Sequence, residues 1–276
     1  MRVIAGSTAV VTGAARGIGR AIAEALVREG VKVALVDRDG PLCEQACREL
    51  AGIGPAVRAY PLDVRDGPAF AAVVDQVGAE LGAVDILVNN AGIMSLGGFL
   101  DQDPALDDRQ IDVNLRGVIH GMRAAVPGMV RRGRGHVVNV ASVAGKVGVP
   151  NAAVYAATKH AVVGLTEAAH HELHDRGVWC SYVLPSLVDT ELLSGAGRLR
   201  YPPVVKPAQV AAAVVHALRT GEVDVYVPRF GRLAAVLPAV LPRRVVETVG
   251  RWFGIDRVFD GVDPAARAAY QGRLGS

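Results

Sequence analysis

Tyr155 and Lys159 are the residues whose types and spacing suggest chemistry most directly. They lie four residues apart in a segment from about Pro150 to Arg176 that predicts one helix, so both side chains would share a face. A free phenol has a pKa of about 10, whereas a general acid/base works best near the working pH. A lysine ammonium about 4 Å away would lower that pKa by roughly 3 units at an effective dielectric of about 20. The pair therefore predicts proton transfer, although taken alone it also fits a lysine lying along a half-buried ring.

A glycine-rich turn near the N-terminus predicts a diphosphate site. The β-branched run Thr8–Thr12 fits a buried strand, and an apolar-periodic helix follows the turn. Without Cβ atoms the backbone can approach phosphates, and a helix N-terminus adds N–H groups and a positive dipole end. A plain structural turn is the alternative, since the spacing Gly-x-x-x-Gly-x-Gly differs from the commonest dinucleotide fingerprint. The turn contains Gly13, Ala14, Ala15, Arg16, Gly17, Ile18 and Gly19.

Asp37 follows the next predicted strand, Val31–Val36, about 20 residues beyond the glycine turn. A carboxylate there can accept both hydroxyls of an adenosine ribose and would repel a 2′-phosphate. This favours NAD(H) over NADP(H). Arg16 and Arg38 are an objection because either can pair with a 2′-phosphate, and Asp37 can instead cap the helix that starts near Gly40.

Polar or very small residues follow three further predicted strands. Asp63-Val64 closes strand 56–62, Asn89-Asn90-Ala91-Gly92 follows strand 84–88, and Ser142 follows strand 135–141. Such residues suit a site where a ligand lies against backbone, or they are ordinary turn and cap residues. Asn114 lies within a long predicted helix from about Pro104 to Arg131, where most asparagines are simply solvated.

Strands and helices alternate along most of the chain, which predicts a parallel sheet covered by helices on both faces. Ligands bind such sheets at the carboxyl ends of the strands, where the residues above converge. The remaining predicted elements are helices 41–50, 67–81 and 207–218, strands 178–184 and 223–227, and a loop over 186–206.

Composition and charge exclude several classes of protein. The chain has 276 residues, a net charge of +3 and no basic stripe, which argues against nucleic-acid binding. Three cysteines, Cys43, Cys47 and Cys180, form no metal or disulfide pattern, and the segment 170–174, His-His-Glu-Leu-His, lacks metalloprotease spacing. No apolar run is long enough to span a membrane and no signal peptide is expected, so we expect a cytoplasmic protein.

The last fifty residues follow a different pattern. We expect residues 1–228 to form the catalytic domain and residues 229–276 to form a C-terminal extension. Within the extension, Arg243–Gly254 predicts an amphipathic helix with Val245, Val249, Trp252 and Phe253 on one face. It would act as a lid or a subunit contact, and a helix lying on a membrane surface is the alternative.

Taken together, these motifs resemble the short-chain dehydrogenase/reductase family over roughly residues 5–228. The matching motifs are Thr12-Gly13-x-x-x-Gly17-Ile18-Gly19, Asn89-Asn90-Ala91-Gly92, Asn114, Ser142 and Tyr155-x-x-x-Lys159, in the family's order. The resemblance implies a Rossmann-type doubly wound α/β fold, a single domain with a seven-stranded parallel sheet. It also implies a homodimer or homotetramer.

The resemblance implies a role for each catalytic residue. Tyr155 would be the general acid/base, and Lys159 would lower its pKa and hold the nicotinamide ribose. Ser142 would steady the substrate oxygen, and Asn114 would support a water in the proton relay.

Cofactor contacts are implied in the same way. The diphosphate would lie on Gly13, Arg16, Gly17, Ile18 and Gly19, the adenosine ribose on Asp37, and the adenine on Asp63 and Val64. Asn90, Ala91 and Gly92 would contact the middle of the cofactor. The segment Pro185–Thr190 resembles the family's nicotinamide loop, in which Val188 and Thr190 would contact the carboxamide. Ser186 stands where the family usually has glycine, which leaves the path of this loop open.

We therefore expect an oxidoreductase that transfers a hydride between NAD(H) and a secondary alcohol or ketone. Apolar residues in the expected substrate walls favour a hydrophobic substrate, such as a steroid-like, retinoid-like or long-chain alcohol. The alternatives are an NADP(H)-dependent carbonyl or 3-ketoacyl reductase, and a non-catalytic NAD(H)-sensing protein. The wall residues are Met94, Leu96, Val147, Val149, Leu192 and Leu193.

Overall fold

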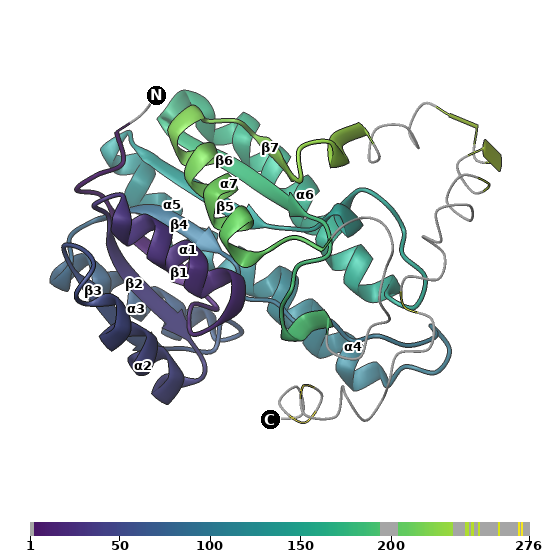
Figure 1. Cartoon of the computed structure of the whole chain (residues 1–276). Coiled ribbons are helices and arrows are strands. Elements are labelled where there is room, and N and C mark those ends of the chain that lie inside the picture. The colour runs from purple at the N-terminus through teal and green to yellow at the C-terminus, as the bar shows by residue number, and fades with distance from the viewer. Residues whose placement is uncertain are drawn as a thin grey trace.

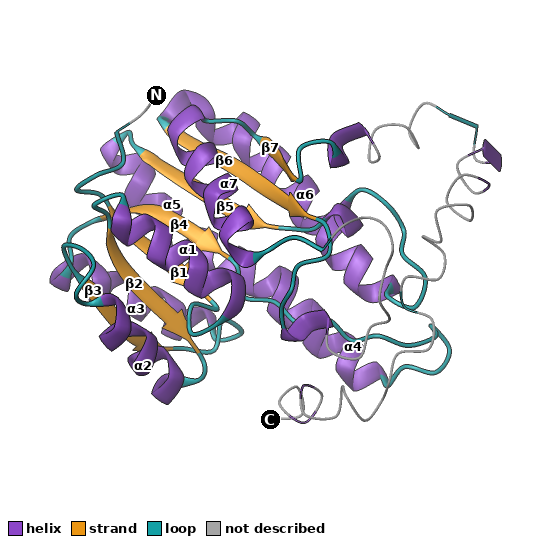
Figure 2. Cartoon of the chain, viewed as in Figure 1, coloured by secondary structure: helices purple, strands orange, loops and turns teal. Residues whose placement is uncertain are grey.

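The computed structural model describes residues 3–193, 204–233, 241–242, 244–245, 248, 259, 270 and 272. Strands and helices alternate through this part of the chain, as the sequence predicts (Figure 2). The strands are β1 (Thr8–Thr12), β2 (Lys32–Asp37), β3 (Val57–Pro61), β4 (Val84–Asn89), β5 (Gly135–Val140), β6 (Val178–Pro185) and β7 (Asp224–Val227). The helices are α1 (Gly17–Arg28), α2 (Gly40–Leu50), α3 (Gly67–Glu80), α4 (Pro104–Ile111), α5 (Gly117–Arg132), α6 (Ala153–Leu173) and α7 (Pro207–Thr220).

The seven strands form one parallel sheet in the order β3-β2-β1-β4-β5-β6-β7. Helices α1, α2 and α7 lie in front of this sheet in Figure 1, and α3, α5 and α6 lie behind it. Strand order reverses between β1 and β4, and such a reversal opens a ligand site beyond the carboxyl ends of the two strands. The predicted fold class is confirmed.

Side chains along β2 are buried alternately on the two faces of the sheet, as is typical of a central strand. Val33 and Leu35 pack into the core beneath α1, α2 and α7, whereas Ala34 and Val36 pack into the core on the other face. Side chains that alternate between two buried faces must be apolar at every position, which explains the continuous apolar runs in the sequence.

The long helix predicted from about Pro104 to Arg131 is divided into three parts. Helix α4 ends at Ile111, a π-helical turn spans Asp112–Arg116, and α5 continues through Pro127 to Arg132. Asn114 lies in the π-helical turn and is 1% exposed, so it is not a solvated residue. A π-helical turn is rare and is frequent at functional sites.

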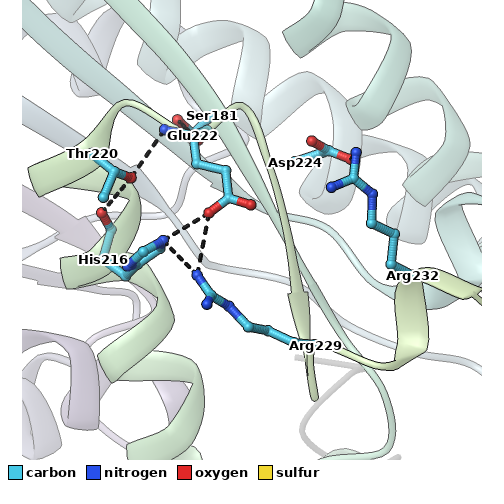
Figure 3. A network of polar contacts seen from close by, with 7 residues as sticks. All are labelled: Ser181, His216, Thr220, Glu222, Asp224, Arg229 and Arg232. Carbon is cyan, nitrogen blue, oxygen red and sulfur yellow. Dashed lines mark hydrogen bonds and ion pairs between the residues drawn. The ribbon is translucent and has the colours of Figure 1, made fainter.

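The C-terminal extension is anchored where it leaves the sheet (Figure 3). Arg229 and His216 both contact the Glu222 carboxylate, at 3.5 and 2.7 Å, and Arg232 lies 3.6 Å from Asp224. These pairs connect the first residues after β7 to the edge formed by α7 and β7. The amphipathic helix predicted over Arg243–Gly254 lies largely outside the described residues, as does most of the extension.

No helix in the described part of the chain has the length and apolar character needed to cross a membrane. The metal-like histidine segment packs instead on an aromatic ring. The His174 and Trp179 ring centres are 4.4 Å apart, and those of His170 and Trp179 are 5.7 Å apart.

Candidate active site

The glycine-rich turn between β1 and α1 leaves no room for a side chain at Gly13 or Gly19. A Cβ on Gly19 would lie 2.0 Å from the main-chain oxygen of Gly13, and a Cβ on Gly13 would lie 3.0 Å from Asn90 Nδ2. Asn90 Nδ2 donates to the main-chain oxygens of Thr12 and Gly13, at 2.9 and 3.2 Å, and so fastens the turn to the end of β4. The turn and the Asn90 segment therefore form one surface.

Helix α1 begins at this surface with no side-chain cap. Its N-cap residue, Arg16, has extended backbone and makes no capping hydrogen bond. The first N–H groups of α1 therefore point to the glycine turn, and a helix N-terminus of this kind binds phosphate. The glycines of the turn and the end of the helix together fit the diphosphate of a dinucleotide.

Asp37 lies beside the turn and does not cap α2. Its Oδ2 accepts from the backbone N–H of Ala15 at 3.0 Å, and its Oδ1 accepts from that of Asp39 at 3.1 Å. The cap of α2 is Asp39, which accepts from Leu42 N–H at 3.2 Å, so the capping alternative for Asp37 is wrong. Arg16 forms an ion pair with Asp39 at 2.5 Å, which directs its guanidinium to a carboxylate.

The predicted adenine residues lie at the end of β3. Asp63 is paired with Arg65, whose Nη2 lies 2.5 Å from its Oδ2, and Val64 is buried. Arg65 also donates its backbone N–H to Asp63 Oδ1 at 3.0 Å. The Asp63 carboxylate is thus held at the carboxyl end of β3, and Asp37 lies at the carboxyl end of the neighbouring strand β2.

Asn114 bonds to the segment that follows β4, which Asn90 connects to the glycine turn. Its Oδ1 accepts from Ile93 N–H at 2.8 Å and its Nδ2 donates to Ile93 O at 2.9 Å. Nδ2 also donates to Thr158 Oγ1 at 3.1 Å, which connects Asn114 to α6. A Cβ on Gly92 would lie 3.3 Å from Asn114 Oδ1 and 3.6 Å from Lys159 Nζ, so Gly92, Asn114 and Lys159 lie together.

Tyr155 and Lys159 project from the first two turns of α6 toward the same edge. Lys159 Nζ lies 5.7 Å from the centre of the Tyr155 ring and donates to Val140 O at 2.9 Å. Ser142 follows β5 and forms a hydrogen bond with the Tyr155 side chain. Its Oγ also accepts from Ala144 N–H at 3.2 Å and donates to Pro185 O at 3.4 Å.

The expected lowering of the Tyr155 pKa by Lys159 is not seen in the protein alone. Burial raises the pKa of Tyr155 to about 12, the hydrogen bond with Ser142 opposes this, and Tyr270 raises it further. Burial also lowers the pKa of Lys159 to about 8. The two side chains do lie close together, but burial of the phenol dominates its pKa, and Lys159 is not among the groups that shift it.

The segment after β6 reaches the glycine turn at Thr190. Ser186 N–H donates to Val227 O at 2.8 Å, and Val188 is buried and forms a parallel bridge with Val205. A Cβ on Gly17 would lie 3.5 Å from Thr190 Cγ2, so Thr190 lies next to the turn. Serine at position 186 is therefore compatible with a loop that runs from β6 to the glycine-rich turn.

An apolar cluster lies beside Tyr155, which we call the outer cluster. Its buried members are Met94, Leu96, Ala152 and Phe259, and Val149, Tyr155, Leu187, Leu192 and Leu193 pack against them. Most of the predicted substrate walls are in this cluster. Sequence reasoning missed Phe259, as well as Tyr270, whose hydroxyl accepts from Met94 N–H at 2.9 Å.

Comparison with known proteins agrees with this geometry. The family model described as short chain dehydrogenase matches residues 7–198. The chain belongs to the short-chain dehydrogenase/reductase family. It is therefore an NAD(P)-dependent oxidoreductase that acts on CH–OH or carbonyl groups, and the predicted enzyme class is confirmed.

Several curated members of the family are similar to this chain. The ketoacyl reductase HetN of Nostoc sp. is 34% identical over 263 residues, which cover 92% of each chain. Sorbitol dehydrogenase of Cereibacter sphaeroides is 40% identical over 215 residues, covering 76% of this chain and 83% of that one. A third relative, 2-(S)-hydroxypropyl-CoM dehydrogenase 3 of Xanthobacter autotrophicus, is 37% identical over 223 residues, covering 75% of this chain and 88% of its own.

Proposed function

We propose that this protein interconverts a hydrophobic secondary alcohol and its ketone with NAD(H), and that Tyr155 is the general acid/base. The observation that carries the proposal is the meeting of Tyr155, Ser142, Lys159 and Asn114 at one sheet edge, beside a turn that fits a diphosphate. When bound, the nicotinamide of the cofactor supplies or accepts the hydride. The protein supplies orientation and the proton.

Tyr155 carries the proton in this scheme. With a pKa of about 12 the phenol is protonated at neutral pH, which is the form that donates to the oxygen of a ketone as it becomes an alcohol. In the oxidative direction the phenolate accepts the hydroxyl proton, and the nearby Lys159 cation favours that charged form. Ser142, already bonded to the phenol, would hold the substrate oxygen within reach of it.

Lys159 and Asn114 both lie near Gly92 and have different roles in the proposed reaction. Lys159 Nζ donates to Val140 O, and because an ammonium has three N–H groups it can also bind the hydroxyls of the nicotinamide ribose. Asn114 fixes the backbone of Ile93 and contacts α6 through Thr158, which supports its role in positioning a relay water.

NAD(H) is favoured over NADP(H) by charge. The Asp37 carboxylate lies at the turn, and Arg16, one of the two arginines that could pair with a 2′-phosphate, forms an ion pair with Asp39. A 2′-phosphate would therefore meet negative charge. The apolar outer cluster supports a substrate whose larger substituent is hydrophobic.

The test is a panel of hydrophobic secondary alcohols assayed with NAD⁺ and NADP⁺, with reduced-cofactor absorbance as the readout. We expect turnover with kcat/KM for NAD⁺ at least roughly tenfold higher, which corresponds to about 1.4 kcal/mol. A 3-ketoacyl thioester with NADPH belongs in the panel, because one relative is named a ketoacyl reductase. NADH binding without turnover on any member would instead support a cofactor-sensing protein.

A further inference from the structure

Two aromatic residues of the C-terminal extension are buried at the active site. Phe259 and Tyr270 are each 7% exposed, although both follow β7 by more than thirty residues. Phe259 packs in the outer cluster with Met94, Leu96 and Ala152, and Tyr155 packs against the same cluster. Asn151, just before α6, donates its Nδ2 to Phe259 O at 3.5 Å.

Tyr270 contacts the same stretch of backbone that Asn114 holds. Its hydroxyl accepts from Met94 N–H at 2.9 Å, and the preceding residue, Ile93, is bonded to Asn114 through both backbone groups. The phenol of Tyr270 also lies close enough to Tyr155 to raise the pKa of that residue electrostatically. Tyr270 therefore lies near both Met94 and Tyr155.

The extension reaches this position from the far edge of the sheet. Its first residues are tied by ion pairs of Arg229 with Glu222, just before β7, and of Arg232 with Asp224 in β7, so the chain leaves the sheet at a fixed point (Figure 3). The similarity to HetN covers 92% of this chain, which is more than residues 1–228 can account for. That similarity therefore includes part of the extension.

We propose that Phe259 and Tyr270 form the substrate-side wall of the active site and determine which alcohols it accepts. The proposal rests on the proposed function for its choice of substrate. Phe259 adds apolar surface next to Met94 and Leu96, so it selects an alcohol or ketone whose larger substituent is an alkyl chain or an apolar ring. Tyr270 fixes the position of this wall relative to Tyr155 through its bond to Met94 N–H.

The first experiment compares substrates of increasing length in the full chain. Phe259→Ala is assayed with isopropanol and its longer straight-chain homologues. We expect kcat/KM for the longest substrate to fall roughly tenfold or more and that for isopropanol to change by less than about threefold. Phe259→Leu, which keeps most of the apolar bulk, should lie between Phe259→Ala and the original chain. NADH affinity should be unchanged in both.

Val245→Ala is the matched control, because Val245 belongs to the same extension and is 43% exposed. It should leave the length dependence unchanged. An equal loss on every substrate in Phe259→Ala, or the same length dependence in Val245→Ala, would overturn the assignment of Phe259 to the substrate wall.

A second experiment needs no turnover. Hydrogen exchange of the Met94 amide is measured in the original chain and in Tyr270→Phe, which retains the ring and removes only the acceptor oxygen. We expect faster exchange at Met94 in the variant and unchanged exchange in β4. Unchanged exchange at Met94 would overturn the docking of Tyr270, even if no alcohol in the panel is a substrate. Absence of turnover in the original chain would count against the proposed function alone.

Discussion

The Lys159 ammonium lies 5.7 Å from the centre of the Tyr155 ring and donates to Val140 O at 2.9 Å, in a position only 5% exposed. The contact places a buried cation beside the phenol that the proposed reaction uses. Burial lowers the pKa of Lys159 to about 8, from an ordinary value of 10.5. Holding that charge in the folded protein therefore has a cost in stability that depends on pH.

Lys159→Met should reveal this cost. Below pH 8 both the folded and unfolded forms of the original protein carry the proton, so the burial cost is fully present. Between pH 8 and 10.5 the folded protein loses the proton first and the cost disappears, so stability rises with pH in this window. The original chain should therefore gain up to about 3 kcal/mol relative to Lys159→Met between pH 7 and pH 10. Urea unfolding at both pH values measures this, and a constant difference would contradict it.

Asn114→Ala should impair both stability and turnover. The variant leaves the N–H and C=O of Ile93 without their side-chain partner, at a cost of about 1–3 kcal/mol. We expect kcat to fall at least roughly tenfold at a temperature where the variant is folded, with NADH still bound. Asn139→Ala is the matched control, since Asn139 is equally buried and bonded to Thr166 but lies inside β5. Similar loss of kcat in both variants would indicate a purely structural role for Asn114.

Gly19→Ala should weaken cofactor binding. The new methyl group would lie 2.0 Å from Gly13 O, so the turn must move away from the geometry that fits a diphosphate. NADH affinity, measured by fluorescence titration, should fall roughly tenfold or more, which is about 1.4 kcal/mol. Gly78→Ala in α3 is the control, because its methyl group meets nothing within 4 Å and should stabilise the helix by about 0.5–1 kcal/mol. Unchanged NADH affinity in Gly19→Ala would argue against the turn as the diphosphate site.

Asp37→Ser should relax the cofactor preference. Removing the carboxylate removes the like charge that a 2′-phosphate would meet, while the serine hydroxyl can still bond to backbone. We expect the ratio of kcat/KM for NADP⁺ to that for NAD⁺ to rise roughly tenfold or more, or about 1.4 kcal/mol. Asp175→Ser, at an exposed position after α6, should leave the ratio unchanged. A ratio unaffected by Asp37→Ser would mean that another residue sets the preference.

Local patterns were sufficient to predict the fold and the family. Buried parallel strands need continuous apolar runs, and β2 and its neighbours have them, so the alternation of elements could be read directly. Most residues expected to bind cofactor and substrate follow strands, and parallel strands bring their carboxyl ends to one edge. The oligomeric state and the cytoplasmic location stay predictions.

Features that depend on long-range contacts could not be read in this way. The sequence shows a continuous helical pattern through Asn114, whereas the structure has a π-helical turn there. The side chain of Asn114 in this turn bonds to Ile93 and Thr158, which are distant in sequence. The Met94–Tyr270 bond joins residues separated by 176 positions, which no local periodicity encodes. The raised pKa of Tyr155 follows from burial, whereas the sequence showed only its helical distance from Lys159.

Tyr155→Phe tests the central claim most directly, because it removes the hydroxyl and keeps the ring. Turnover of the best alcohol should fall below about one per cent of the original kcat, since proton transfer is typically worth roughly 10²–10⁴-fold. NADH affinity and the unfolding midpoint should be retained. A variant that binds NADH and still turns over alcohol at more than a few per cent of the original rate would contradict the account.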